Sequence, residues 1–146
     1  MRDKWFWATI GTLCWAIAAS LLGGYYYMQS QSLTAAVGEY ERFTMRVNLC
    51  IDYGNGSRTW YNETLVPMGC NLLTATKEVA DVESTFWPEY MASFVDSING
   101  VANNATHYWM WSYWDEGSGT WAHGQVGADL YPLSPGHRAL WRYERA

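Results

Sequence analysis

The clearest pattern in the chain is an alternation of apolar and polar side chains that begins at residue 43. Apolar side chains occupy every second position from 43 to 53: Phe43, Met45, Val47, Leu49, Ile51 and Tyr53. A period of two is typical of a β-strand with one buried face. The turn-forming sequence Gly54-Asn-Gly-Ser57 follows, and residues 58–66 form a second strand, so the pattern predicts a β-hairpin.

A helix is predicted over residues 72–80, after the second strand ends at Pro67. Asn71 can cap its first turn, and the expected buried stripe is Leu72, Leu73, Thr76 and Val79. Further short strands are predicted at 82–87, 94–98, 108–114 and 138–143, with a partly extended segment at 125–131. One hairpin, one helix and several later strands define the α+β class.

The first 28 residues have a different character. The segment from Trp5 to Met28 carries no charged side chain, is long enough to span a bilayer as a helix, and has aromatic residues at both ends. Arg2 and Lys4 precede it, which predicts a single-pass anchor of the cell membrane with a cytoplasmic N-terminus. A signal peptide cleaved after Ala18 is the alternative. Residues 29–42 are expected to form a linker, and residues 43–146 an extracellular domain.

Composition excludes some partners and suggests chemical modifications. The net charge is −5 without any basic stripe, which argues against nucleic acid as a partner. An extracellular domain could carry glycans at the three Asn-x-Ser/Thr sequences, which begin at Asn55, Asn62 and Asn104. Cys50 and Cys70 could form a disulfide there, or could remain two buried thiols.

Candidate catalytic groups are sparse, so we expect no enzyme. His107, His123 and His137 are scattered and show no metal-ligand spacing, although a metal bound by these histidines is a minor alternative. Asp115 and Glu116 are adjacent, so their side chains would point apart along a strand and could not converge on a substrate. No glycine-rich phosphate loop precedes a helix.

The stretch 107–114, "HYWMWSYW", concentrates aromatic rings on a predicted strand. One of its faces would hold His107, Trp109, Trp111 and Tyr113, and the other Tyr108, Met110, Ser112 and Trp114. One face should pack on the predicted helix, and no second helix outside the anchor could cover the other. We favour the first set, together with Trp121, as the uncovered face that binds a ligand or a partner.

Four stretches in this order resemble a known family: "VNLCIDYGNG", "LVPMGCNLLTAT", "SFVDSINGVANNATHYWMWSYW" and "GADLYPLSPGHRALWRY". Together they are similar to domains of unknown function that look like the C-terminal domain of transcobalamin and intrinsic factor, in the soluble-ligand-binding β-grasp group. The resemblance covers about residues 43–143. It implies a β-grasp-like domain, a mixed sheet curling around one helix.

The resemblance also implies ligand binding or an interaction role, and some members bind cobalamin with help from another domain. Two features depart from the family pattern. A Val-Asn-Gly sequence that many relatives carry is replaced around Tyr113–Gly117, and His137 stands where the last turn usually has an acidic residue.

Two functional expectations result. The first is a membrane-anchored, extracellular, non-catalytic domain that serves as an accessory subunit, with other protein subunits as partners. The alternative is a cell-surface module that binds a small molecule, cobalamin-like or otherwise planar. No resident cofactor is expected.

Overall fold

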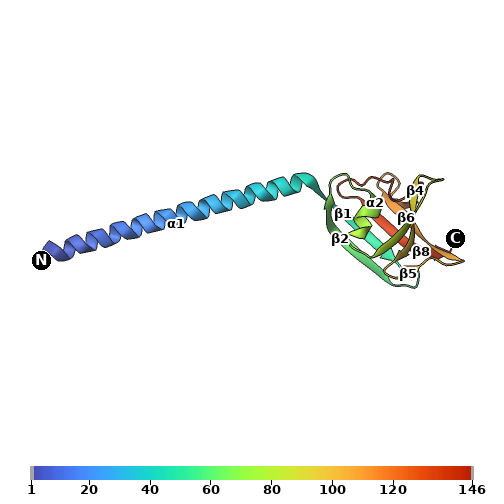
Figure 1. Ribbon diagram of the computed structural model, residues 1–146, viewed down its shortest axis with the longest axis horizontal. Coiled ribbons are helices and arrows are strands. Elements are labelled where there is room, and N and C mark those ends of the chain that lie inside the picture. The colour runs from blue at the N-terminus through green and yellow to red at the C-terminus, as the bar shows by residue number, and fades with distance from the viewer. Residues whose placement is uncertain (1, 146) are drawn as a thin grey trace. The chain divides into compact units, whose positions relative to one another are not determined.

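The computed structural model describes residues 2–145, and the side chains of residues 2–6 and 8 also lie outside the description. The chain divides into two compact units, with the boundary between Glu41 and Arg42. The first unit is a single helix, and the second holds every strand and the second helix of the described residues (Figure 1).

The N-terminal unit is helix α1 (Arg2–Phe43). A helix is therefore present where the apolar run was found. The segment 29–42, which was predicted to be a linker, is part of the same helix. The good helix formers Ala, Gln and Glu recur in that segment, and it contains no proline. Among the residues whose side chains are described, no helix is long and apolar enough to cross a membrane, so the predicted anchor at residues 1–28 is not supported.

The C-terminal unit is built on a mixed five-stranded sheet of order β2-β1-β8-β6-β7. Its strands are β1 (Thr44–Asp52), β2 (Arg58–Pro67), β6 (His107–Asp115), β7 (Thr120–His123) and β8 (Arg138–Arg145). β1 and β8 are parallel, and the other neighbours are antiparallel. The predicted hairpin is therefore confirmed from Thr44 onward, whereas Phe43, expected on its buried face, ends α1 and is exposed. β1 and β8, which are far apart in the sequence, lie side by side in the sheet.

The turn of this hairpin is held against β8. Gly54 has a φ of +71° and lies so close to β8 that a Cβ there would overlap the carbonyl oxygen of Tyr143. Gly56, two residues later, has a φ of +89° and open space around it. A left-handed conformation favours glycine at both positions, but only Gly54 is also restricted by a neighbour.

Helix α2 (Leu72–Lys77) covers one face of the main sheet (Figure 1). The Asn71 side chain caps it by accepting a hydrogen bond of 2.7 Å from the Thr74 N–H, as predicted. The helix ends three residues earlier than expected. Its buried Thr76 accepts a hydrogen bond of 2.8 Å from the Trp141 indole N–H of β8, which fixes α2 on the sheet. The expectation of a mixed sheet packed on one helix is confirmed for this unit.

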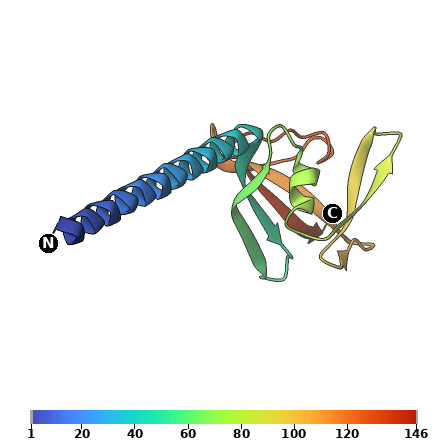
Figure 2. The same ribbon diagram turned by 60° about the vertical axis from the view of Figure 1, so that its left-hand side comes forward.

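A smaller sheet of order β3-β4-β5 stands beside the main one (Figure 2). It consists of β3 (Val82–Trp87), β4 (Ala92–Ile98) and β5 (Val101–Ala102). The strands predicted at 82–87 and 94–98 are present. Residues 125–131, expected to be partly extended, instead form turns that connect β7 to β8.

Candidate functional site

The aromatic strand β6 has the opposite orientation to the one that we favoured. Trp109 and Trp111 are only 5% and 8% exposed and belong to the core beside α2. Tyr108 and Met110, on the other face, are 38% and 44% exposed. Both sets of side chains are large and apolar, so the sequence pattern alone could not show which face is buried. The prediction that the Trp109 and Trp111 face is uncovered was therefore wrong.

The remaining members of the predicted binding set are dispersed. His107 stacks on Tyr143 with a ring-centroid distance of 5.6 Å, and Tyr113 stacks on Tyr131 at 5.5 Å. Trp121 lies on the opposite face of the sheet, in contact with other tryptophans. The structure thus does not join the five residues into one site.

Part of the second face of the main sheet is covered by tryptophan side chains from within the same unit. The ring centroids of Trp60 and Trp121 lie 6.4 Å apart, and those of Trp114 and Trp121 lie 5.5 Å apart. The Arg138 guanidinium lies 4.8 Å from the Trp114 ring centroid, as in a cation–π contact. Cys50, which pairs with Trp60 in the sheet, is fully buried on this face. A second helix or a partner is not required to cover this part of the sheet.

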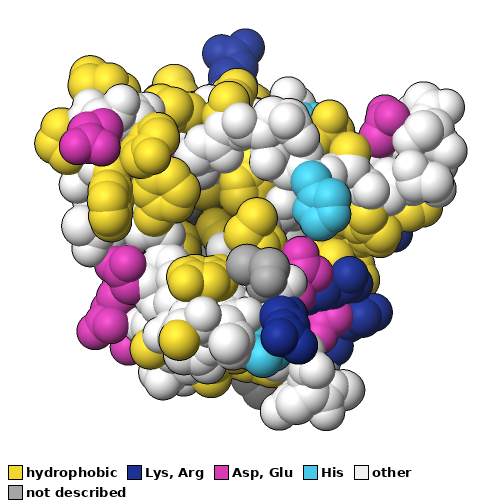
Figure 3. Space-filling model, turned by 90° about the vertical axis from the view of Figure 1, so that its right-hand side faces the viewer, with side chains coloured by type: hydrophobic (Ala, Val, Ile, Leu, Met, Phe, Trp, Pro, Cys, Tyr) yellow, Lys and Arg dark blue, Asp and Glu magenta, His cyan; other side chains and the backbone are white. Residues whose placement is uncertain are grey.

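A hollow of about 380 Å³ opens between β4, β6 and the turns of residues 124–130, and we call it the aromatic pocket. Its apolar walls include Phe94, Val95, Trp109, Trp111, Val126 and Leu130. None of the residues that line it carries a charged side chain. In Figure 3, hydrophobic side chains gather around a hollow on the face shown. An apolar concave site of this volume is typical of small-molecule pockets.

The wall formed by the 124–130 segment is fixed in place. The Trp111 indole N–H donates a hydrogen bond of 3.0 Å to the Val126 carbonyl, and the Gly124 N–H donates one of 2.9 Å to the Trp111 carbonyl. Gly124 touches the Trp111 ring so closely that a Cβ would overlap it. The pocket therefore has a wall that is formed before any ligand binds.

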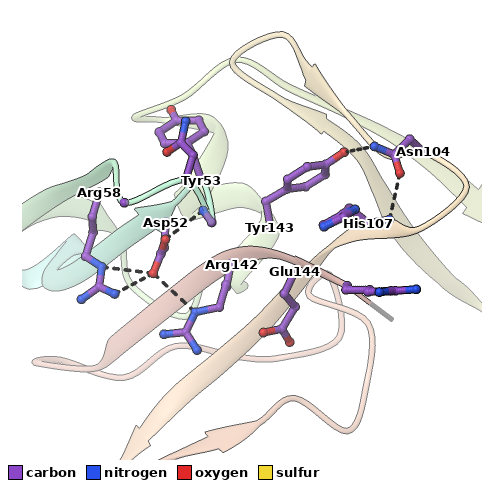
Figure 4. Close-up of a pocket in the computed structure, with 12 residues that line it drawn as sticks. Asp52, Tyr53, Arg58, Asn104, His107, Arg142, Tyr143 and Glu144 are labelled. Carbon is purple, nitrogen blue, oxygen red and sulfur yellow. Dashed lines mark hydrogen bonds and ion pairs between the residues drawn. The ribbon is translucent and has the colours of Figure 1, made fainter.

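A second, more open hollow of about 760 Å³ lies at the hairpin end of the sheet and is lined by charged side chains (Figure 4). Asp52 lines it and binds Arg58 and Arg142, with nitrogen–oxygen distances of 2.6 and 3.4 Å. Burial tends to raise the pKa of Asp52, but the hydrogen bond from the Gly54 N–H and the charge of Arg58 outweigh it, so that pKa lies below its ordinary value. This cluster joins one carboxylate of β1 to two guanidinium groups, one from β2 and one from β8, and we assign it to holding the hairpin.

Cys50 and Cys70 lie on opposite sides of the main sheet. Cys50 and Cys70 are both free, so the possible bridge between them is not formed. Cys50 lies on the second face of β1, whereas Cys70 precedes α2 on the core side. Burial raises the pKa of the Cys50 thiol to about 11.

The asparagines that begin the three glycosylation sequences are all exposed. The side-chain amide of Asn104 donates a hydrogen bond of 2.9 Å to the Tyr143 hydroxyl, so this asparagine already has a structural contact. The side-chain oxygen of Asn55 accepts a hydrogen bond from the Ser57 N–H inside the hairpin turn. Glycosylation of these three asparagines stays a prediction.

The histidines lie in three unrelated places. His107 stacks on Tyr143, His123 lies 3.4 Å from the Ser112 hydroxyl, and His137 accepts a hydrogen bond from the Ser134 N–H. Within the part of the chain that the structure describes, no group of three His, Cys, Asp or Glu side chains could hold a metal ion.

Trp109 and Trp111 of the predicted binding set line the aromatic pocket, but the pocket itself was not predicted from the sequence. Its walls come from two different sheets and one connecting segment, and no periodicity links them. Two signals were available: glycines at 124 and 127, which permit close backbone approach, and the cluster of Phe86, Trp87, Tyr90 and Phe94 around a short turn. Neither signal shows that β4 lies beside β6.

Comparison with known proteins gives a fold likeness and no family. No family model matches the chain, and no curated protein matches it. A crystal structure of a protein from Ruminococcus gnavus, to which metal binding has been ascribed, is 14% identical, with 70% of this chain and 98% of that one covered and a TM-score of 0.51. Haptocorrin in complex with Cbi is 17% identical over 69% of this chain, also with a TM-score of 0.51.

The haptocorrin match spans 25% of that protein's length. Likeness at these identities shows the fold alone. It agrees with the fold that the transcobalamin-like resemblance implied, and it leaves membership of that family open.

Proposed function

We propose that this protein is a non-catalytic module that binds a small molecule in the aromatic pocket. The observation that carries the proposal is a preformed hollow, walled by Phe94, Trp109 and Trp111, without a charged lining residue. Burial of apolar ligand surface against such rings gives affinity without any chemical step. Haptocorrin, a protein of similar fold, holds Cbi in its solved structure, which supports a binding role for this fold.

A neutral, apolar fluorescent dye, N-phenyl-1-naphthylamine, tests the pocket in the full chain. Phe94 lines the pocket and is 47% exposed, so truncation to Ala should leave the fold intact. We expect saturable binding to the wild type and about tenfold weaker binding to Phe94→Ala, because a ring contact and its buried area are lost.

Phe86 provides the matched control, because it is 54% exposed on the neighbouring strand and does not line the pocket. Phe86→Ala should bind the dye as the wild type does. Equal losses in the two variants, or no saturable binding to the wild type, would contradict the proposal.

A cobalamin-like ligand is the planar alternative. The aromatic pocket, at about 380 Å³, is at the small end of ligand pockets, so a corrinoid ring would have to lie across its mouth. Tryptophan fluorescence during titration with cobalamin tests this alternative. Saturable quenching that Phe94→Ala weakens and Phe86→Ala does not would favour a corrinoid.

A role as an accessory subunit is the second candidate. The end of β3 and the turn after it expose Trp87, Tyr90 and Met91 by 48%, 63% and 68%, as a protein-docking surface would. For this second candidate we also propose a location, in which the C-terminal unit lies outside the cell and the N-terminus in the cytoplasm. Protease treatment of intact cells tests the location, and mass spectrometry of co-purified proteins tests the partner. Co-purification that survives Tyr90→Ala would count against the turn as the docking surface.

A further inference from the structure

The aromatic pocket follows the edge of strand β6. It is lined by three consecutive residues, Trp109, Met110 and Trp111. Successive side chains of a strand point to opposite faces, so one cavity can touch all three only along the strand edge, where the backbone is accessible. The ligand site therefore includes main-chain groups as well as rings.

The free part of this edge is short and clearly bounded. At one end, the Trp109 N–H donates a hydrogen bond of 2.9 Å to the Asn103 side-chain oxygen. At the other end, the Trp111 carbonyl accepts one of 2.9 Å from the Gly124 N–H. β7 pairs with β6 only from Ser112 onward, so no strand continues between these two points.

Two main-chain groups lie between these ends. The N–H and the carbonyl of one strand residue point the same way, so the Trp109 carbonyl and the Trp111 N–H point away from β8. No hydrogen bond joins either group to another described residue. They form an acceptor and a donor beside the apolar walls, and such groups need a partner when water is displaced.

The facing edge of β4 closes the hollow at the same two ends. The Asn103 side-chain amide also donates a hydrogen bond of 2.7 Å to the Val95 carbonyl, so this residue bridges β4 and β6. At the far end, the Ser93 N–H donates one of 2.7 Å to Asp129. The gap between the strands is therefore too short for a long extended segment, and it suits a small molecule.

We propose that the ligand of the aromatic pocket is a small, neutral molecule with a peptide-like unit. Its own N–H would donate to the Trp109 carbonyl, its own C=O would accept from the Trp111 N–H, and an apolar group would fill the space between the rings. This is the pairing that one residue of a parallel strand would make. An anionic ligand is disfavoured, because no lining residue carries a positive charge that could compensate its loss of hydration. This inference rests on the proposed binding function.

Matched compounds test the inference on the full chain. N-acetyl-L-leucinamide supplies the N–H donor, the C=O acceptor and an apolar side chain. Its variant that is methylated at the acetamido nitrogen lacks this N–H donor. N-acetyl-L-leucine carries a carboxylate in place of the terminal amide. We expect the first to displace N-phenyl-1-naphthylamine and to shift the Trp111 amide resonance in nitrogen-15 spectra. The methylated compound should bind about 3- to 10-fold more weakly, because one hydrogen bond is lost. The carboxylate should bind at least about tenfold more weakly.

The outcomes distinguish the binding function of the aromatic pocket from the pairing of its ligand with the edge of β6. If the dye binds, and the leucinamide and its methylated variant bind equally, the strand-edge pairing is overturned while the apolar binding function stands. If neither the dye nor the leucinamide binds, both are overturned. Tighter binding of a capped pentapeptide with leucine at its centre would overturn the assignment to a small molecule. Weaker leucinamide binding in Phe94→Ala, with Phe86→Ala unchanged, would support both.

Discussion

Asp52 is the clearest case of one residue that organises its surroundings. It is 6% exposed at the end of β1. One of its carboxylate oxygens accepts the Gly54 N–H at 3.0 Å, and the other accepts Arg58 and Arg142. The hairpin turn, β2 and β8 are thus all linked through a single ionised group.

This geometry predicts how stability depends on pH. The folded-state pKa of Asp52 is below its unfolded value, so its contribution is complete above the unfolded pKa and decreases as pH falls through the folded pKa. Asp52→Asn should lower the free energy of unfolding by about 1–3 kcal/mol at pH 7, because charge-assisted hydrogen bonds are lost. Thermal unfolding at several pH values should show the gap to the wild type narrowing below about pH 4.

Glu116 is an exposed carboxylate in the turn after β6 and provides the control. Glu116→Gln should leave the pH dependence close to that of the wild type. A gap between Asp52→Asn and the wild type that stays constant down to pH 2 would mean that Asp52 acts through packing and not through its charge.

At the scale of elements, the contact between α2 and β8 depends on one buried polar pair. The Thr76 hydroxyl accepts the Trp141 indole N–H at 2.8 Å and donates to the Leu72 carbonyl at 2.7 Å. Both Thr76 and Trp141 are almost fully buried. A buried indole N–H without an acceptor is costly, so the hydroxyl does more than fill space.

A double-mutant cycle should detect this coupling. Thr76→Val should lower the free energy of unfolding by about 1–3 kcal/mol, because the Trp141 N–H loses its acceptor. In the Trp141→Phe background the same change should cost about 1 kcal/mol less, since no indole N–H remains. Urea unfolding of the four proteins measures the coupling. Thr74→Val, an exposed change on the same helix, is the control, and strict additivity would contradict the prediction.

The sequence predicted the elements better than their faces. The hairpin of β1 and β2 and the helix capped by Asn71 follow from local signals, namely alternation, turn glycines and a capping side chain. The orientation of β6 was wrong, because Trp109 and Tyr108 are both large rings and alternation does not show which one is inside.

The candidate site was almost out of reach of the sequence. It depends on the approach of β4 to β6, which the amide of Asn103 mediates by binding Val95 and Trp109. An asparagine after a short hairpin gives no sign of this contact in the sequence. The covering of the second face was also missed, since Trp60 and Trp121 are far apart in the chain and meet only in the folded sheet.

At the scale of the whole molecule, the two compact units differ in how they are stabilised. Every residue of the hydrophobic core cluster and every partly buried apolar residue packed on it lies between Met45 and Tyr143. None of the described side chains of the first unit belongs to that core cluster. The C-terminal unit therefore has what an independently folding domain needs.

A fragment of residues 42–146 should fold by itself. We expect it to keep the near-ultraviolet circular dichroism of its ordered tryptophans. Its unfolding midpoint should match that of the same unit in the full chain, because no core contact is removed. Loss of the near-ultraviolet signal, or a clearly lower midpoint, would show that α1 contributes to the stability of the fold.

The contact between Gly54 and β8 also has a consequence for protein engineering. The hairpin turn contains one glycine that no other residue can replace without moving Tyr143, and another, Gly56, that faces open space. A peptide tag or a label grafted into this loop should therefore be inserted beside Gly56, and Gly54 should be left untouched. The turn would then provide an attachment point on the surface of the domain, remote in sequence from the strands that line the aromatic pocket.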